Sequence, residues 1–256
     1  MTAGADDWTG WPEGTARLVL EETDSTLGEA ERRFDTLTGP TWILAKRQTS
    51  ARGRRGRAWH QPAGNFAGTF VTREDGGPDR AALRSFTASL ALFDAFVAVT
   101  GRADPFALKW PNDVLLNGGK VAGILLESVQ RQGRMVGVSI GIGINLAGAP
   151  QAADLPPEAV RPVALAPDTG VLVTPEEFLT PLAAAMAAHE ARFRDYGFAP
   201  IREAWLARAA RLGEEIVART GTAETRGIFE TVDAQGRLIL QTPSGRQAIA
   251  AADVYF

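Results

Sequence analysis

KVAGILLESV (Lys120–Val129) and MVGVSIGIGI (Met135–Ile144) are the two stretches of sequence that decide the fold. Each is apolar on both faces, so we expect neighbouring strands in the middle of a sheet. A turn over Arg131–Arg134 joins them, and Asn117-Gly118-Gly119 has the composition of a hairpin turn leading into the first. The sequence therefore predicts a buried β-hairpin at the centre of the fold.

Strands and helices on either side of this hairpin predict an α+β domain, a mixed sheet packed with helices. Apolar residues in Ala82–Val99 recur at steps of three and four, the period of one helix face. The other expected strands are Arg17–Glu22, Thr41–Lys46, Asn65–Thr72, Phe106–Trp110 and Val114–Leu116. The expected helices are Leu27–Leu37, Ala82–Val99, Glu176–Tyr196 and Ile201–Leu212, with mostly loop between Gly148 and Pro175.

The pattern changes after residue 212, where short strands follow one another through Gly-containing turns. We expect a small all-β barrel of about 45 residues appended to the α+β domain. Its expected strands are Glu215–Thr220, Glu224–Val232, Arg237–Thr242 and Gln247–Tyr255.

The amino-acid composition excludes several classes of functional site. The 256 residues include 27 Lys and Arg, 30 Asp and Glu, a formal net charge of -3 and no cysteine. Lack of cysteine excludes disulfides, iron–sulfur clusters, thiolate zinc sites and cysteine nucleophiles. The two histidines, His60 in a loop and His189 on a helix surface, do not predict a metal site. The near-neutral charge argues against bulk nucleic-acid binding, and no signal peptide or membrane span of ~18–20 residues is evident, so we expect a cytoplasmic protein.

The segment QTSARGRRGRAW (Gln48–Trp59) holds four arginines within six residues. Their mutual repulsion and the glycines between them predict a loop that is mobile when empty. Guanidinium groups bind phosphate through paired hydrogen bonds, Gly53 and Gly56 let backbone N–H groups approach the oxygens, and Trp59 is placed to stack on a base. Three interpretations stay open for this segment alone: a triphosphate-binding loop, a nucleic-acid contact and a solvated basic turn.

A second segment, KWPND (Lys109–Asp113), precedes the central hairpin. Lys120 opens an apolar strand, where partial desolvation strengthens its attraction to an anion, and Gly123 leaves room for a ligand. Asp113 lies in a turn and can accept a proton or hold an amine. The alternative is structural: a plain turn followed by a lysine that protects a strand edge.

The third segment, GIGINL (Gly141–Leu146), lacks the third glycine and the following helix of a dinucleotide-binding fingerprint. Glycines on one face of a central strand indicate a flat ligand against the backbone, with Asn145 placed to meet an adenine edge. A bulged strand packed on a helix is the alternative.

In this order, the three segments closely resemble the biotin protein ligases. The matching stretches are ARGRRGRAW (Ala51–Trp59), LKWPNDVLLNGGKVAGILLE (Leu108–Glu127) and SIGIGINL (Ser139–Leu146). Asp24-Ser25-Thr26 matches the family's biotin-site turn, and Glu214–Val254 resembles its small SH3-like domain. The resemblance implies a lead-in (1–16), a class II synthetase-like catalytic domain (17–212) and a C-terminal SH3-like β-barrel (213–256).

The resemblance also implies a two-step reaction. Biotin and Mg²⁺-ATP give biotinyl-5′-adenylate, which then acylates one lysine of the biotin carrier domain of a carboxylase of the acetyl-CoA carboxylase type. By similarity, the catalytic residues are Lys120, Asp113 and Arg54. The implied biotin-binding residues are Ser25, Thr26, Gln48, Arg52, Gly53, Arg54, Lys120, Gly123, Gly141 and Gly143. Those implied for ATP and the adenylate are Arg52, Arg54, Arg55, Arg57, Trp59, Asn112 and Asn145. No side-chain metal site is implied, because Mg²⁺ is expected with ATP.

Two positions depart from the family pattern. Leu27 stands where the family usually has Asn, which bears on one ureido hydrogen bond, and Ala51 stands where it usually has Gly, which stiffens the loop slightly.

Residues 1–16 are too short for the winged helix of repressor-ligases, so we expect a ligase that does not bind DNA. Two alternatives remain: a lipoate or octanoate ligase or transferase of the same superfamily, and a non-catalytic nucleotide- or nucleic-acid-binding module. A homodimer through the central sheet and a monomer are both compatible with the sequence.

Overall fold

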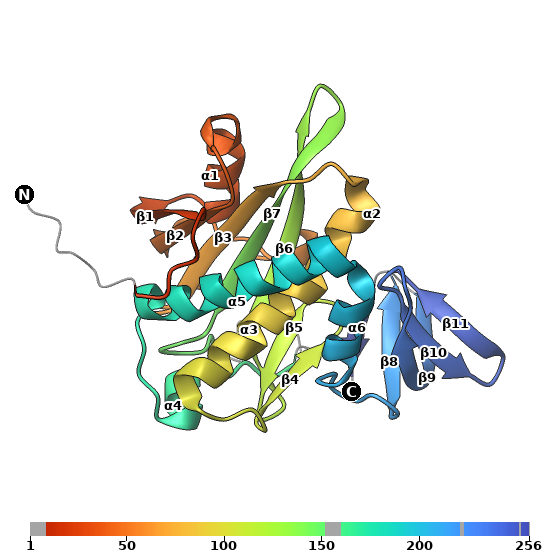
Figure 1. Ribbon diagram of the computed structural model, residues 1–256. Helices are drawn as coiled ribbons and strands as arrows, with labels where there is room; N and C mark the ends of the chain where they lie inside the picture. The colour runs from red at the N-terminus through yellow and green to blue at the C-terminus, as the bar shows by residue number, and fades with distance from the viewer. Residues whose placement is uncertain (1–8, 152–159, 221–222, 251, 256) are drawn as a thin grey trace, which may run out of the picture.

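The computed structural model describes residues 9–151, 160–220, 223–250 and 252–255 (Figure 1). Its helices are α1 (Thr26–Arg33), α2 (Gly77–Ala82), α3 (Arg84–Thr100), α4 (Leu165–Thr169), α5 (Pro175–Tyr196) and α6 (Phe198–Leu206), with 3-10 turns η1 (Phe34–Thr36) and η2 (Arg54–Gly56). The strands of the first sheet are β1 (Ala16–Thr23), β2 (Thr41–Gln48), β3 (Phe66–Arg73), β4 (Phe106–Lys109), β5 (Asp113–Leu116), β6 (Gly119–Arg131) and β7 (Arg134–Ile144). Those of the second are β8 (Glu215–Thr220), β9 (Ala223–Val232), β10 (Leu238–Thr242), β11 (Gly245–Ile249) and β12 (Asp253–Tyr255).

The larger sheet is mixed and has the strand order β1-β2-β3-β7-β6-β5-β4. Only β1 and β2 run parallel to each other; the other neighbours are antiparallel. The predicted hairpin is confirmed, because β6 and β7 pair with each other and have β5 and β3 on their outer sides. Asn117 and Gly118 both adopt positive φ (49° and 77°), as a tight hairpin turn requires.

Strand β7 divides its side chains between two faces of the sheet. Ile140, Ile142 and Ile144 are buried in the main hydrophobic core, whereas the alternating glycines Gly141 and Gly143 face the other way. Strand β2 follows the same rule: Leu44 belongs to the main core, and Ile43 belongs to a second cluster with Ala30 and Phe34. The sheet therefore has one heavily packed face and one face partly covered by α1.

Helices α3 and α5 cover the heavily packed face, as Figure 1 shows. Phe178, Leu182 and Met186 of α5 are buried in the main core. By length and composition the helical stretch Gly77–Thr100, with a mean hydropathy of 1.5, could cross a bilayer, although we expected no such run. Of its apolar window, 61% is buried inside the protein, which is what the core helix of a folded domain shows.

The C-terminal segment forms an antiparallel sheet in the order β11-β10-β9-β8-β12, beside α6 in Figure 1. The strand expected over Gln247–Tyr255 is wrong in extent: the chain forms two strands there, β11 on one edge and β12 on the other. The small sheet shares the main core through Trp205 and Phe229. Trp110 Nε1 also donates a hydrogen bond to the Gly236 carbonyl (3.0 Å), which ties this sheet to the segment that precedes β5.

Three further expectations need correction. Helix α6 begins at Phe198 and ends at Leu206, short of the expected Leu212, because the chain turns there and Arg211 takes a positive φ of 62°. The short helix α4 lies in the stretch expected to be mostly loop. His189 lies between helices rather than on an open surface: its side chain is 13% exposed and its Nε2 is 2.7 Å from Asp94 Oδ2 of α3.

Candidate active site

One cavity of about 480 Å³ lies on the sheet face opposite α3 and α5. Its walls come from the start of α1, the segment 52–60, strands β5 to β7 and the C-terminal strand β12. It brings together the predicted site residues Ser25, Thr26, Gln48, Arg52, Gly53, Arg54, Arg57, Trp59, Asn112, Asp113, Lys120, Gly123, Gly141, Gly143 and Asn145. Arg55 belongs to the turn η2, but its side chain lies outside what the structure describes.

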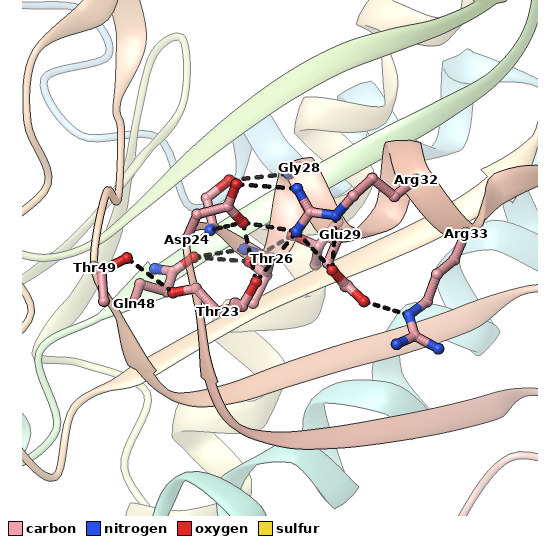
Figure 2. Close-up of polar contacts among 11 residues, drawn as sticks. Thr23, Asp24, Thr26, Gly28, Glu29, Arg32, Arg33, Gln48 and Thr49 are labelled. Carbon is pink, nitrogen blue, oxygen red and sulfur yellow. Dashed lines mark hydrogen bonds and ion pairs between the residues drawn. The ribbon is translucent and has the colours of Figure 1, made fainter.

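The turn before α1 is held by local hydrogen bonds (Figure 2). Ser25 is the N-cap of α1, and its Oγ accepts the Gly28 N–H (2.9 Å). Arg32 reaches back to Asp24 with two donors (2.7 and 3.0 Å) and, with the Ser25 N–H, holds the pKa of that carboxyl well below its usual range. The backbone at Ser25 and Thr26 is therefore fixed, and the hydroxyl proton of Ser25 can point into the cavity.

A chain of hydrogen bonds sets the orientation of Gln48. Its Oε1 accepts the Thr26 N–H (2.7 Å) and the Thr26 hydroxyl (3.1 Å), and the Thr26 oxygen in turn accepts from the buried hydroxyl of Thr69 (2.8 Å). The Gln48 amide nitrogen is consequently directed away from Thr26, toward Gln61 (3.3 Å). This end of the cavity presents neutral hydrogen-bonding groups, which suit an uncharged polar ligand group.

The glycines of the sheet make room for side chains that cover it. A Cβ at Gly141 would lie 2.8 Å from Leu27 Cδ1, and one at Gly143 would lie 2.6 Å from Trp59 Cζ2. Both glycines also line the cavity, and the expectation of a flat ligand against them stays a prediction. In this conformation Leu27 and Trp59 cover the glycines, and both residues line the cavity themselves.

The opposite end of the cavity is cationic. Lys120 Nζ is 2.7 Å from Asp113 Oδ1 and 5.6 Å from the centre of the Trp59 ring. Burial by itself would raise the pKa of the Asp113 carboxyl, but Lys120 and Lys109 beside it hold that pKa below its ordinary value. Asp113 is therefore a carboxylate at neutral pH, and the lysines around it outnumber it.

The arginines of the segment 52–57 contact four other residues, Glu127, Asn112, Ala252 and Asp253. Arg52 forms a two-pronged ion pair with Glu127 of β6 (3.1 and 3.0 Å). Arg54 donates to Asn112 Oδ1 (3.2 Å) and to the Ala252 carbonyl (3.4 Å). Arg57 Nη2 is 3.0 Å from Asp253 Oδ2, and Arg54 Nη1 is 3.7 Å from the other oxygen of that carboxylate. The loop arginines are held by carboxylates and carbonyls, which an anionic ligand could replace.

Two asparagines of the predicted site are occupied by protein groups. Asn145 is buried; its Nδ2 donates to the Val163 carbonyl (3.0 Å) and its Oδ1 accepts from Asn65 (3.4 Å). Asn112 donates to the Ile124 carbonyl (2.5 Å) while accepting from Arg54. In this conformation the Asn145 amide shapes the wall of the cavity, and its contact with an adenine edge stays a prediction.

Residues without a predicted role also line the cavity. Lys109 lies within the KWPND segment, but nothing in its spacing indicated that its side chain would be buried next to Asp113. Arg219, Asp253 and Tyr255 come from the C-terminal sheet, at least 75 residues beyond the end of β7 at Ile144. Their patterns are those of ordinary strands, so no local signal marks them as part of a site.

Among the described residues, no group of three or more His, Cys, Asp or Glu side chains is arranged to bind a metal ion. The carboxylates that face the arginine and lysine groups, Asp113, Glu127 and Asp253, are all in ion pairs. The cavity thus offers a neutral polar end and a cationic end, an arrangement that fits a ligand with one polar ring and one or more anionic groups.

Family profiles match most of the chain. The profile of the Biotin/lipoate A/B protein ligase family matches residues 19–145, and the Biotin protein ligase C terminal domain matches residues 212–256. The second match spans the small antiparallel sheet.

Individual proteins extend this likeness over almost the full length. The biotin–[acetyl-CoA-carboxylase] ligase of Paracoccus denitrificans is 58% identical over 238 residues, which are 93% of this chain and 99% of that protein. The bifunctional ligase/repressor of Bacillus subtilis is 32% identical, covering 92% of this chain and 71% of that protein. The structure of the biotin protein ligase from Aquifex aeolicus in complex with biotin and ATP superimposes with a TM-score of 0.78 at 25% identity, covering 93% of this chain and 98% of that one.

Proposed function

The chain belongs to the Biotin/lipoate A/B protein ligase family, and from this premise we propose how it works as a biotin protein ligase. The observation that carries the proposal is the two-ended cavity, with neutral hydrogen-bonding groups at Ser25, Thr26 and Gln48 and cations at the end that holds Lys120. Biotin has the same division, with an uncharged ureido ring at one end and a carboxylate at the other. ATP adds a second anion at the cationic end.

In the first step, a carboxylate oxygen of biotin attacks the α-phosphorus of ATP, and pyrophosphate leaves. Two anions must approach each other, so the barrier falls only if cations lie where they meet. Lys120 and the arginines of segment 52–57 are the groups available there. We assign Lys120 to the biotin carboxyl and the α-phosphate, and Arg52 and Arg54 to the adenylate, each in exchange for its present protein partner.

In the second step, the neutral amine of an acceptor lysine attacks the acyl carbon, and AMP leaves. We assign Asp113 to accept the proton of the incoming ammonium, because it is ionised and lies beside Lys120. Closure of the arginine segment over the adenylate excludes water and preserves a hydrolysable intermediate in the meantime.

The remaining partners are proposed on the same basis. Mg²⁺ is expected to arrive on the triphosphate, since the described residues offer no carboxylate cluster to hold it. The acceptor is the carrier domain of a biotin-dependent carboxylase, in line with the Paracoccus denitrificans relative. We propose a cytoplasmic enzyme without DNA binding, and sedimentation measurements distinguish a monomer from a homodimer.

Incubation with ATP and radiolabelled biotin, or with ATP and radiolabelled lipoate, tests the proposal. We expect an acid-labile adenylate and pyrophosphate only with biotin, followed by stable labelling of one lysine when a biotin carrier domain is added. An adenylate formed only with lipoate would overturn the assigned substrate. A non-catalytic nucleic-acid-binding module would instead bind oligonucleotides in a salt-dependent manner and release no pyrophosphate.

A further inference from the structure

Lys109 is a buried lysine in the wall of the cavity. It ends β4 directly opposite Asp113, the first residue of β5, in the ladder that joins these two strands. Its side chain is 8% exposed, whereas that of Lys120 is 29% exposed. A lysine is almost never buried unless it is paired, so the position of Lys109 calls for an anion nearby.

That anion is Asp113, which lies between two lysines. Its Oδ1 is 2.7 Å from Lys120 Nζ, and its Oδ2 is 3.8 Å from Lys109 Nζ. Each carboxylate oxygen therefore faces one ammonium group. Lys120 and Lys109 thus both stabilise the ionised form of Asp113, each from the side of a different carboxylate oxygen.

In the proposed reaction, the adenylate competes with Asp113 for one of these lysines, Lys120. Lys120 is the more exposed of the two and must turn toward the adenylate, which removes the cation closest to Asp113. A carboxylate buried without a counter-ion takes up a proton, and a protonated Asp113 cannot accept the proton of the acceptor lysine. Arg54, the other cation facing Asp113, is bonded to Asn112 and the Ala252 carbonyl.

We propose that Lys109 is a positioning residue that keeps Asp113 ionised and directed at the cavity while Lys120 is engaged with the adenylate. The inference rests on the proposed function and assigns Lys109 to the second step. There the acceptor ammonium gives its proton to Asp113, its nitrogen forms a bond to the acyl carbon, and the bond from that carbon to the phosphate oxygen breaks as AMP leaves with the electron pair.

The charged groups around Lys109 and Asp113 come from four segments of the chain. Asp113 is faced by Lys109 of β4, Lys120 of β6 and Arg54 of the arginine segment. Lys109 is further influenced by Asp253 of β12. Burial lowers the pKa of the Lys109 ammonium and Asp113 opposes that shift, so the charge of Lys109 depends on the carboxylate it supports.

The test measures adenylate formation and transfer separately in the Lys109→Met variant. The substitution replaces the ammonium by an uncharged side chain of similar length. Transfer from preformed adenylate to a carrier domain is followed in a single turnover across pH. We expect the acid limb of the transfer rate to move up by at least about one pH unit, because loss of a cation raises the pKa of Asp113. Adenylate formation should change by only a few-fold, since Lys120 remains.

Lys109→Arg keeps the charge and should leave the acid limb where the wild type has it. This second variant keeps the inference testable if Lys109→Met does not fold. The matched control is Lys46→Met, because Lys46 is the remaining lysine of the chain and pairs with Glu21 on the outer strands; its pH profile should be unchanged.

An unshifted acid limb in Lys109→Met, or a shifted one in Lys109→Arg, would overturn the assignment. So would an equal loss in both steps without a pH shift, which is the result of a merely structural role. Failure of the proposed function looks different, because the wild type would then form no biotin-dependent adenylate at all.

Discussion

Two parts of the cavity contrast in construction: the sheet floor and the arginine segment above it. The floor is formed by β6 and β7, which are paired on both sides and whose isoleucines are buried in the main core. The arginine segment, residues 52–57, has one short turn and is attached by ion pairs. Arg52 is 49% exposed and Arg57 is 57% exposed.

The contrast indicates a division of labour. Opening of paired, buried strands costs close to the whole stability of the domain, whereas a segment attached by exposed ion pairs opens at little cost. The floor can therefore hold the shape of the cavity constant, and the arginine segment can exchange its protein partners for an anion. The predictions below test this division, beginning with the largest expected effect.

Lys120→Ala removes the cation that the floor contributes. Adenylate formation should fall by at least about 10²–10³-fold, the loss seen when one preorganised group for a developing negative charge is removed. Circular dichroism and the melting temperature should stay close to wild type, because the side chain is partly exposed. Wild-type turnover of biotin and ATP in this variant would refute the role of Lys120.

Arg54→Gly alters the arginine segment and leaves the sheet floor intact. The adenylate should dissociate about a hundredfold faster, in line with the loss of hydrogen bonds to a charged group. Released adenylate should then label lysines of an unrelated bystander protein, measured by streptavidin blotting. Arg102→Gly, in a loop outside the cavity, is the control and should retain the intermediate as the wild type does; equally tight retention in Arg54→Gly would show that the segment is not the clamp.

Gly143→Ala alters the rigid part by a single methyl group. Its Cβ would lie 2.6 Å from Trp59 Cζ2, so the indole must move, and overpacking of this kind costs ~1–3 kcal/mol. Calorimetry should show that the combined affinity for biotin and ATP falls roughly tenfold. Gly148→Ala is the matched control, since nothing lies within 4 Å of the added methyl. Unchanged affinity in Gly143→Ala would mean that β7 moves to accommodate the methyl group, which would contradict a floor of constant shape.

Asp253→Asn tests the contact between the arginine segment and the C-terminal sheet. The carboxylate holds Arg57 and lies near Arg54, so it competes with phosphate oxygens for both. Arg57 is the exposed partner of this pair, and ion pairs of exposed residues contribute about 0–1 kcal/mol, so the KM for ATP should fall by no more than about fivefold. Glu230→Gln, which breaks the pair with Arg246 elsewhere in that sheet, should leave KM unchanged. A KM that rises would give Asp253 a direct part in nucleotide binding.

The sequence predicted the sheet floor, β6 and β7, better than it predicted the side chains that cover this floor. The strands β6 and β7 follow from apolar runs and a turn signal that are local in the chain. By contrast, the contact of Leu27 with Gly141 and that of Trp59 with Gly143 depend on which segments meet across the sheet. The internal hydrogen bonds of Asn145 are likewise set by the loop that follows β7 and by Asn65 of a distant segment.

The same limit applies to the charges. Four closely spaced arginines are visible in the sequence, but their partners Glu127 and Asp253 are distant and have no distinctive spacing. Burial of Lys109 beside Asp113 depends on the β4–β5 ladder and on the C-terminal sheet that packs nearby. Local patterns therefore predict which groups are present, and tertiary contacts decide which of them face one another.

Amide hydrogen exchange of the wild type, with and without biotin and ATP together, tests the division between floor and arginine segment most directly. We predict that amides of residues 51–59 exchange quickly without substrates and become protected once the adenylate has formed, while amides of β6 and β7 are protected in both states. An arginine segment already protected without substrates, or protection gained mainly in β6 and β7, would contradict the account.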